Sequence, residues 1–572
     1  MERIAEALDA ARATSSRNAK VDAIAEALLD AAVRDEPALR MAVRVALAQA
    51  FAPFDERTAA VGWRMLMPAL SAASGVSEEE IAAEARRTGD LGDAAELVLA
   101  QRPKSGAGLS PADVSELFDA LARAGSRGTK ARLLTNALSA ASPRLGKYLT
   151  KTLLGEARTG VVEGVVMLAI SKAFGADHDE VRRAHALVSD AAVVARLAYD
   201  RGLGNARLVL GHPVQPMLAS PIEASKAPVD WGRVIVEDKL DGVRAQLHAF
   251  EGKVVLFGRG QGTITGAFPD VVRALQRMMD VVLDGEILAV NADAGPRPFQ
   301  ALQARLGRKS PEPSLLLEVP AAFFAYDILF HDGESLIELP WTERRKRLEA
   351  LASDYPLRVN PYWPVASERE LESAFTAARA RGHEGVMLKR TDAPYEAGAR
   401  GASWLKVKHA AATLDVVVTA VEQGHGKRAD VISDYTFAVA KGDELVDVGK
   451  AYSGLTDVEI AELTPTFEAL TISQRGGWRK VTPTIVLEVA FDGLQRSDRH
   501  ESGYSMRFPR IVRVRGDKNP TEIDTLETVA RIYASHVESG HREEPLPPKT
   551  KTKTKKAVSA DQLDLFGEPK KR

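Results

Sequence analysis

The chain has 572 residues, of which 45% are hydrophobic and 27% are charged, and its formal net charge is −2. This length predicts about three or four domains of globular type. The absence of cysteine excludes disulfide bonds and cysteine-ligated zinc. There is no signal-like start and no apolar run of about 20 residues, so we expect a cytoplasmic protein. The net charge leaves nucleic-acid binding open, because such binding depends on local basic patches.

Residues 1 to about 205 are predicted to be helical. Apolar residues recur at helical spacing in residues 21–29, and Ser110 followed by Pro111 is typical of a helix start. Glycines then interrupt the pattern on both sides of Arg158. Backbone amides at a helix start, together with Arg158, Lys147 and Lys151, are suited to phosphate contacts. A plain glycine break with a solvated arginine explains the same residues.

The next region, to about residue 411, contains the stretch around which the chain is organised. Lys239 stands two residues before Asp241-Gly242. Residues 233–236 before it, and the alternation of apolar and polar residues in 243–249 after it, indicate half-buried strands. Lys239 is therefore expected on a turn between strands. A rigidly held amine is a candidate nucleophile if its proton is lost, and an ordinary exposed turn is the alternative.

Further strands are predicted in this region, with helices at about 269–279 and 342–351. The strands are expected at residues 253–257, 281–286, 322–328, 385–389 and 404–408. Lys406 and Lys408 are two residues apart on one strand, so both amines lie on one face, where they can reach a phosphate and favour loss of the Lys239 proton. Phe324 and Tyr326 also share a strand face, and either ring can stack on a base.

From about residue 412 to 543 the sequence predicts short strands separated by glycines, with one helix near 456–470. Such closely spaced strands favour a small β-barrel. Beyond about residue 544, proline and lysine dominate and little apolar surface is left, which predicts a flexible tail. The tail ends in an apolar hook, Gln562-Leu563-Asp564-Leu565-Phe566.

Seven short motifs occur in a fixed order along these regions. They are Lys239-Leu240-Asp241-Gly242-Val243-Arg244, Phe257-Gly258-Arg259, Asp284-Gly285-Glu286, Phe324-Ala325-Tyr326-Asp327, Glu384-Gly385-Val386, Trp404-Leu405-Lys406-Val407-Lys408 and Arg515-Gly516-Asp517-Lys518. The series resembles the ATP-dependent DNA ligases of the covalent nucleotidyltransferase superfamily. Each motif alone has an ordinary structural explanation, but their order is far more specific. One motif departs from the family pattern, because glycines replace the serine and asparagine around Arg259.

The resemblance implies a role for each motif, with ATP and Mg²⁺ as cofactors. Lys239 would become covalently linked to AMP. The residues implied to bind the nucleotide are Glu237, which would accept from the adenine amino group, Tyr326, which would stack on adenine, Arg515 and Lys518, which would engage the leaving pyrophosphate, and Arg244, Arg259, Glu286, Lys406 and Lys408. Glu286 and Glu384 are hard oxygen donors of the kind that magnesium prefers. Arg158 and Arg259 would contact DNA.

The resemblance also implies a domain plan and partners. Residues 1–205 would form a helical DNA-binding domain, 206–411 the α/β adenylation domain with antiparallel sheets, 412–543 an OB-fold β-barrel and 544–572 a flexible tail. A hinge is expected near 408–413, since the OB-fold domain must close over ATP and then grip DNA. Gln562, Leu563, Leu565 and Phe566 resemble the peptide with which bacterial proteins bind the sliding clamp. The expected partner is nicked duplex DNA, bound by a nucleoid-associated monomer.

Two other functions share some of these features. The mRNA capping guanylyltransferases have similar lysine and terminal motifs, but the long helical region argues against them. A catalytically silent DNA-binding scaffold tethered to the clamp would tolerate loss of Lys239, whereas a ligase would not. NAD-dependent ligases are disfavoured because their cysteine zinc site is impossible here.

Overall fold

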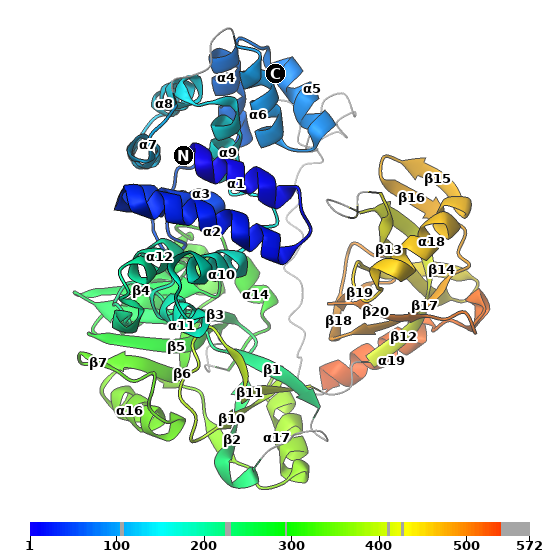
Figure 1. Ribbon diagram of the computed structural model, residues 1–572. Helices are drawn as coiled ribbons and strands as arrows, with labels where there is room; N and C mark the ends of the chain where they lie inside the picture. Colours follow the sequence, from blue (N-terminus) through cyan, green and yellow to red (C-terminus); the bar gives the residue numbers. More distant parts are fainter. Residues whose placement is uncertain are drawn as a thin grey trace. The chain divides into compact units, whose positions relative to one another are not determined.

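The protein is described by a computed structural model, which covers residues 1–102, 108–223, 230–291, 295–408, 412–424, 428 and 430–538 (Figure 1). The chain divides into two compact units, residues 1–411 and 412–572. Among the described residues, no helix is long and apolar enough to cross a membrane.

Helices α1 to α12 form the first part of unit one, drawn in blue to blue-green in Figure 1. Their side-chain caps follow the sequence: Ser110 accepts from the backbone N–H of Asp113 and Pro111 opens α7, as predicted. The apolar spacing in residues 21–29 lies on α2, whose Ile24 and Leu28 are fully buried. The helices are α1 (Glu2–Arg12), α2 (Arg17–Arg34), α3 (Glu36–Ala46), α4 (Trp63–Ser74), α5 (Glu78–Thr88), α6 (Leu91–Ala100), α7 (Pro111–Arg123), α8 (Arg127–Ala140), α9 (Pro143–Leu154), α10 (Glu163–Phe174), α11 (His178–Val188) and α12 (Ala191–Tyr199).

The rest of unit one contains two sheets. In the first, the strand order is β1 (Leu218–Glu223), β11 (Arg400–Lys408), β10 (Gly385–Arg390), β2 (Val234–Lys239) and β9 (Tyr362–Pro364). All neighbours are antiparallel except β1 and β11. Strand β1 was not predicted; it lies just after the expected domain boundary at residue 205, where several prolines and glycines are typical of a connection rather than a strand.

The second sheet has the order β4 (Lys253–Gly258), β3 (Val243–Phe250), β5 (Val281–Ala289), β6 (Ala321–His331) and β7 (Glu334–Ser335), with β8 (Arg358–Val359) beside β6. Its apolar residues share one core with Leu302 and Leu348 of the neighbouring helices and with Phe268, the residue before a helix. The helices beside this sheet in the chain are α13 (Pro269–Leu275), α14 (Gln300–Gln303), α15 (Pro313–Glu318) and α16 (Trp341–Asp354). Helix α17 (Glu368–Ala380) instead packs on β2 and β10 of the first sheet.

The connection from β2 to β3 passes from one sheet to the other at Asp241-Gly242. Lys239 is the last residue of β2 rather than a turn residue. A Cβ on Gly242 would lie 2.3 Å from the carbonyl oxygen of Ile287, far inside contact distance. Only glycine therefore allows the chain to pass this close to β5 directly after Lys239.

Replacing Gly242 with alanine is expected to destabilise unit one by about 1–3 kcal/mol, because the backbone of β5 must move to admit the methyl group. Thermal melting of the two proteins measures this. Gly204→Ala is the matched control, since a Cβ there meets nothing within 4 Å. A melting temperature of Gly242→Ala equal to that of the control would contradict the expectation.

Unit two is built on an antiparallel sheet centred on the long strand β12 (Ala412–Gln423). β12 pairs with β13 (Ile432–Lys441), β16 (Trp478–Val481) and β17 (Val486–Phe491). The remaining elements are β14 (Glu444–Ala451), β15 (Thr471–Arg475), β18 (Gly493–Arg496), β19 (Tyr504–Arg507), β20 (Arg510–Val514), α18 (Asp457–Ala469) and α19 (Leu526–Glu538). Sequence reasoning missed α19, although Leu526, Val529, Ala530 and Tyr533 have helical spacing and pack on the core of this unit.

Candidate active site

The register of three strands gathers the candidate residues on one sheet face. On β2, Glu237 and Lys239 pair with Met387 and Gly385 of β10. On β11, Lys406 pairs with Met387 and Trp404 with Lys389. Because alternate residues of a strand point to the same side, these pairings align one set of side chains. That set is Glu237, Lys239, Lys389, Trp404 and Lys406.

Lys239 is held beside Glu384, the residue that precedes β10. The backbone N–H of Glu384 donates to the carbonyl oxygen of Lys239 at 2.9 Å, and the Nζ of Lys239 pairs with the Oε2 of Glu384. The two side chains are 27% and 36% exposed, so a ligand can reach them. Attack by the amine requires this ion pair to break.

In the second sheet, Asp284 anchors Arg244 and Tyr326. The Nε and Nη2 of Arg244 donate to the two Asp284 oxygens at 3.2 and 2.6 Å, and its Nη1 donates to the carbonyl of Met217 at 2.6 Å. The Tyr326 hydroxyl donates to Asp284 at 3.1 Å. Arg244, predicted to bind the nucleotide, is thus largely committed to Asp284, which orients it.

Glu286 lies on β5 in register with Arg244 of β3 and Phe324 of β6. Burial raises the pKa of Glu286 to about 8; the cations Lys239 and Arg244 oppose this shift, and the carboxylates Glu384 and Asp284 add to it. The free-energy cost of burying the ionised Glu286 carboxylate is larger than the stabilisation that its neighbouring cations provide. A bound cation would offset that cost.

A divalent cation fits this donor set. Glu286 and Glu384 supply hard oxygen atoms, and the described residues contain no group of three or more His, Cys, Asp or Glu side chains that could hold a metal alone. Two carboxylates leave most of the coordination shell to phosphate oxygens and water, which is the way magnesium usually binds at nucleotide sites.

The ring of Tyr326 packs edge-to-face on Trp404, with centroids 5.8 Å apart. The Nζ of Lys389 lies 4.7 Å from the Tyr326 centroid and 4.3 Å from that of Trp404. Phe324 belongs to a small apolar cluster with Leu240, the residue after Lys239. The two aromatic side chains of β6 therefore have different surroundings, and Tyr326 is the one beside the aligned set.

Glu237 is buried among partners that sequence reasoning missed. Its Oε2 accepts from Lys389 at 2.8 Å and from the Asn360 amide at 3.3 Å, and Arg345 lies 3.7 Å from Oε1. Burial raises the pKa of Glu237, and the Lys389 cation opposes the shift. Lys389 is the last residue of the strand predicted at 385–389, so its position had a sequence signal. Asn360 and Arg345 had none, because only the fold brings them here.

The other predicted residues of unit one are placed more simply. Arg259 is exposed after β4, Lys406 lies on β11 and Lys408 is the last residue of that strand.

In unit two, Arg515 and Lys518 converge on Asp415 of β12. The Nη1 of Arg515 lies 2.9 and 3.0 Å from the two Asp415 oxygens, and the Nζ of Lys518 lies 2.6 Å from one of them. Arg515 also pairs with Asp517, whose pKa it lowers. One carboxylate thus holds two cations close together. An anionic ligand could bind the same two cations in place of the carboxylate.

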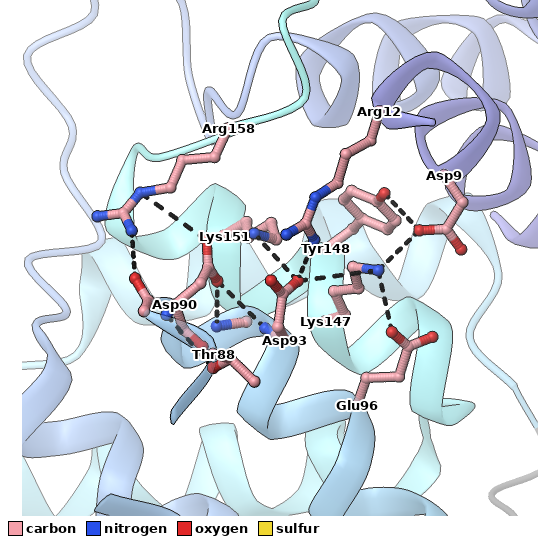
Figure 2. A network of polar contacts seen from close by, with 12 residues as sticks. Asp9, Arg12, Thr88, Asp90, Asp93, Glu96, Lys147, Tyr148, Lys151 and Arg158 are labelled. Atoms are coloured by element: carbon pink, nitrogen blue, oxygen red, sulfur yellow. Dashed lines mark hydrogen bonds and ion pairs between the residues drawn. The ribbon is translucent and has the colours of Figure 1, made fainter. Parts of the chain in front are cut away.

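Arg158 follows α9 in a left-handed backbone conformation, with φ of 47°. Its Nη1 donates to the carbonyl of Gly89 at 2.5 Å, and its side chain is half exposed. Figure 2 shows Lys147 and Lys151 below it, turned toward Asp9, Asp90, Asp93 and Glu96. Lys151 is 2% exposed, with its Nζ 2.5 Å from Asp90. The expectation that Lys147 and Lys151 contact phosphate is wrong, because internal carboxylates already bind both amines.

The tail hook with Gln562, Leu563, Leu565 and Phe566 lies outside the described residues.

Comparisons with known proteins agree with the motif order. Residues 1–171 match the family described as DNA ligase N terminus, 216–408 match ATP dependent DNA ligase domain, and 428–518 match ATP dependent DNA ligase C terminal region. A probable DNA ligase of Koribacter versatilis is 41% identical, covering 94% of this chain and 97% of the relative. A DNA ligase of Thermococcus fumicolans is 35% identical, covering 85% and 90%.

A solved structure described as Pmar-Lig_PreS3 has the same fold, with a TM-score of 0.57 at 17% identity over 90% of this chain and 99% of that one. On the three family matches and the identity to full-length relatives, the chain belongs to the ATP-dependent DNA ligases. The resemblance that its motifs predicted is confirmed.

Proposed function

We propose that this enzyme seals nicks in duplex DNA by passing AMP from ATP through Lys239 to the DNA end. The observation that carries the proposal is the strand register that sets the Lys239 amine beside Glu384 and on one sheet face with Glu237 and Lys406. A nucleophile, phosphate-binding cations and carboxylates then meet at one place, as phosphoryl transfer requires.

The chemistry takes three steps. The deprotonated Nζ of Lys239 attacks the α-phosphorus of ATP, a nitrogen–phosphorus bond forms, and pyrophosphate leaves with the electrons of the broken anhydride bond. The 5′-phosphate at the nick then attacks the same phosphorus and displaces the lysine. Finally the 3′-hydroxyl attacks the adenylated phosphate, releasing AMP and closing the phosphodiester bond.

The side chains around Lys239 bind and orient the nucleotide. Glu237 accepts from the adenine amino group, Tyr326 stacks on the base, and Arg244 keeps Asp284 and Tyr326 in place. Lys406 and Lys408 neutralise the α-phosphate. Mg²⁺ on Glu286 and Glu384 would neutralise phosphate charge as the transition state develops.

Residues 1–205 form the DNA-binding domain, and Arg158 contacts the DNA backbone. Residues 206–411 form the adenylation domain, and Arg259 binds at the nick. Residues 412–543 form an OB-fold domain, whose Arg515 and Lys518 engage pyrophosphate. Residues 544–572 carry the hook that binds a sliding clamp. The OB-fold domain contacts ATP in the first step and DNA in the later ones. The enzyme acts as a cytoplasmic, nucleoid-associated monomer.

Intact mass after incubation with magnesium and ATP, GTP or NAD in separate tubes tests this function. Pyrophosphate is added first, so that any AMP already on the protein is removed. An AMP adduct from ATP alone is expected, followed by joining of a nicked duplex. A GMP adduct would instead place the enzyme with the capping guanylyltransferases, and failure to charge at all would favour the scaffold.

The magnesium requirement is expected to depend on pH. Burial raises the pKa of Glu286 to about 8, so below that pH the carboxyl must lose a proton before it binds a metal. The magnesium concentration for half-maximal adenylation should therefore fall roughly tenfold per pH unit as pH rises toward 8. Glu286→Gln has no such proton, so a slope that persists in this variant would contradict the assignment.

A further inference from the structure

Lys389 is a buried ammonium that takes no part in the steps above. Its side chain is 2% exposed. It stands on β10, in register with Ile235 of β2 and Trp404 of β11, on the same sheet face as Lys239. Its Nζ lies 2.8 Å from the Oε2 of Glu237 and donates to the carbonyl oxygen of Tyr326 at 3.3 Å.

These contacts tie together the two residues assigned to the nucleobase. One amine binds the Glu237 carboxylate and the backbone of Tyr326, and it also lies over the Tyr326 ring. Stability alone is a weak reason for such a pair, because well-packed apolar residues of similar volume often replace a buried ion pair without loss. The position of the ammonium indicates that its role is to orient Glu237 and Tyr326.

Glu237 keeps one oxygen unpaired. Its side chain is 1% exposed, yet Oε1 has no hydrogen-bond donor among the described residues, and Arg345 at 3.7 Å is too far to donate. A buried acceptor without a donor is costly, and a ligand N–H would remove that cost. Lys389 binds the other oxygen, Oε2, and so fixes which oxygen is left for a ligand.

We propose that Lys389 is a positioning residue for nucleobase selection, holding Glu237 charged and oriented so that Oε1 accepts from the 6-amino group of adenine. This inference rests on the proposed function and adds the residue that sets base specificity through Glu237. Lys389 acts without touching the substrate's reacting atoms.

The test compares ATP with purine riboside 5′-triphosphate, which lacks the 6-amino group, as donors for the protein–AMP adduct or its purine equivalent. For the wild-type enzyme, kcat/KM for charging should be at least about tenfold higher with ATP than with purine riboside 5′-triphosphate. In Lys389→Met this ratio should fall close to one, mainly through a higher KM for ATP. Lys346→Met makes the same change at an exposed ion pair on α16 and should keep the wild-type ratio.

The ratio is measured within one preparation, so a smaller folded fraction does not alter it. Lys389→Arg, which keeps the charge and a donor, should retain part of the preference. Glu237→Gln should lower the ratio as Lys389→Met does, and the double variant should lower it no further, because both act through one contact.

Two results would overturn the inference while leaving the ligase intact: a wild-type enzyme that charges equally well from both nucleotides, or a Lys389→Met ratio equal to that of wild type. Additive losses in the double variant would also overturn it, since they would separate Lys389 from Glu237. A wild-type protein that charges from neither nucleotide would instead contradict the proposed function, and this inference would fail with it.

Discussion

Lys239→Ala is expected to lose protein–AMP formation and ATP-dependent nick sealing by at least about 10³-fold, because the variant lacks the amine that lies beside Glu384 at the end of β2. Single-turnover charging with labelled ATP and joining of a nicked duplex measure the two losses. The matched control is Lys253→Ala, which removes an exposed lysine from β4 and should charge normally.

The step that follows charging separates this prediction from simple misfolding. A nick whose 5′-phosphate already carries AMP needs only attack by the 3′-hydroxyl, so Lys239→Ala should still seal it at a substantial fraction of the wild-type rate. A variant that fails on this substrate too, while melting at the wild-type temperature, would show that Lys239 does more than carry AMP. A variant that still forms the adduct would refute the assignment of the nucleophile.

The sequence predicted the parts of the site that lie within one strand. Lys406 and Lys408, or Phe324 and Tyr326, share a face because side chains alternate along any strand. The order of the motifs identified the family. The predicted bounds of β4 and β10 agree with the structure to within one residue, whereas β11 begins four residues before its predicted start. Gly242 was recognised only as part of an Asp-Gly turn; its packing against Ile287 required the second sheet.

Contacts between different strands could not be predicted from the sequence. Nothing in it pairs Glu237 with Lys389 across the β2–β10 register, or brings Asn360 to Glu237 from 123 residues away. The same limit explains the error at Lys147 and Lys151. Lysines beside a glycine-rich loop resemble a phosphate site, but α1 and α6 supply the carboxylates that occupy them. Charge in a sequence indicates a partner only after the internal partners are known.

Arg515→Ala is expected to slow protein–AMP formation by roughly 10- to 100-fold, the usual value of a charge-assisted contact to phosphate. The structure makes the change selective, because Lys518 keeps its 2.6 Å contact with Asp415 and the end of β20 keeps its partner β17. The adjacent Arg513→Ala is the matched control: it removes an exposed arginine that pairs with Glu488.

The loss should be confined to the first step, since pyrophosphate leaves only there. Sealing of a pre-adenylated nick by Arg515→Ala should match that of the Arg513→Ala control. Equal losses in charging and in sealing would show that Arg515 acts on DNA or on the fold of unit two rather than on the leaving group. Asp415→Asn sharpens the distinction: it removes the carboxylate charge that competes with an anion for Arg515 and Lys518, so it should not slow protein–AMP formation as Arg515→Ala does.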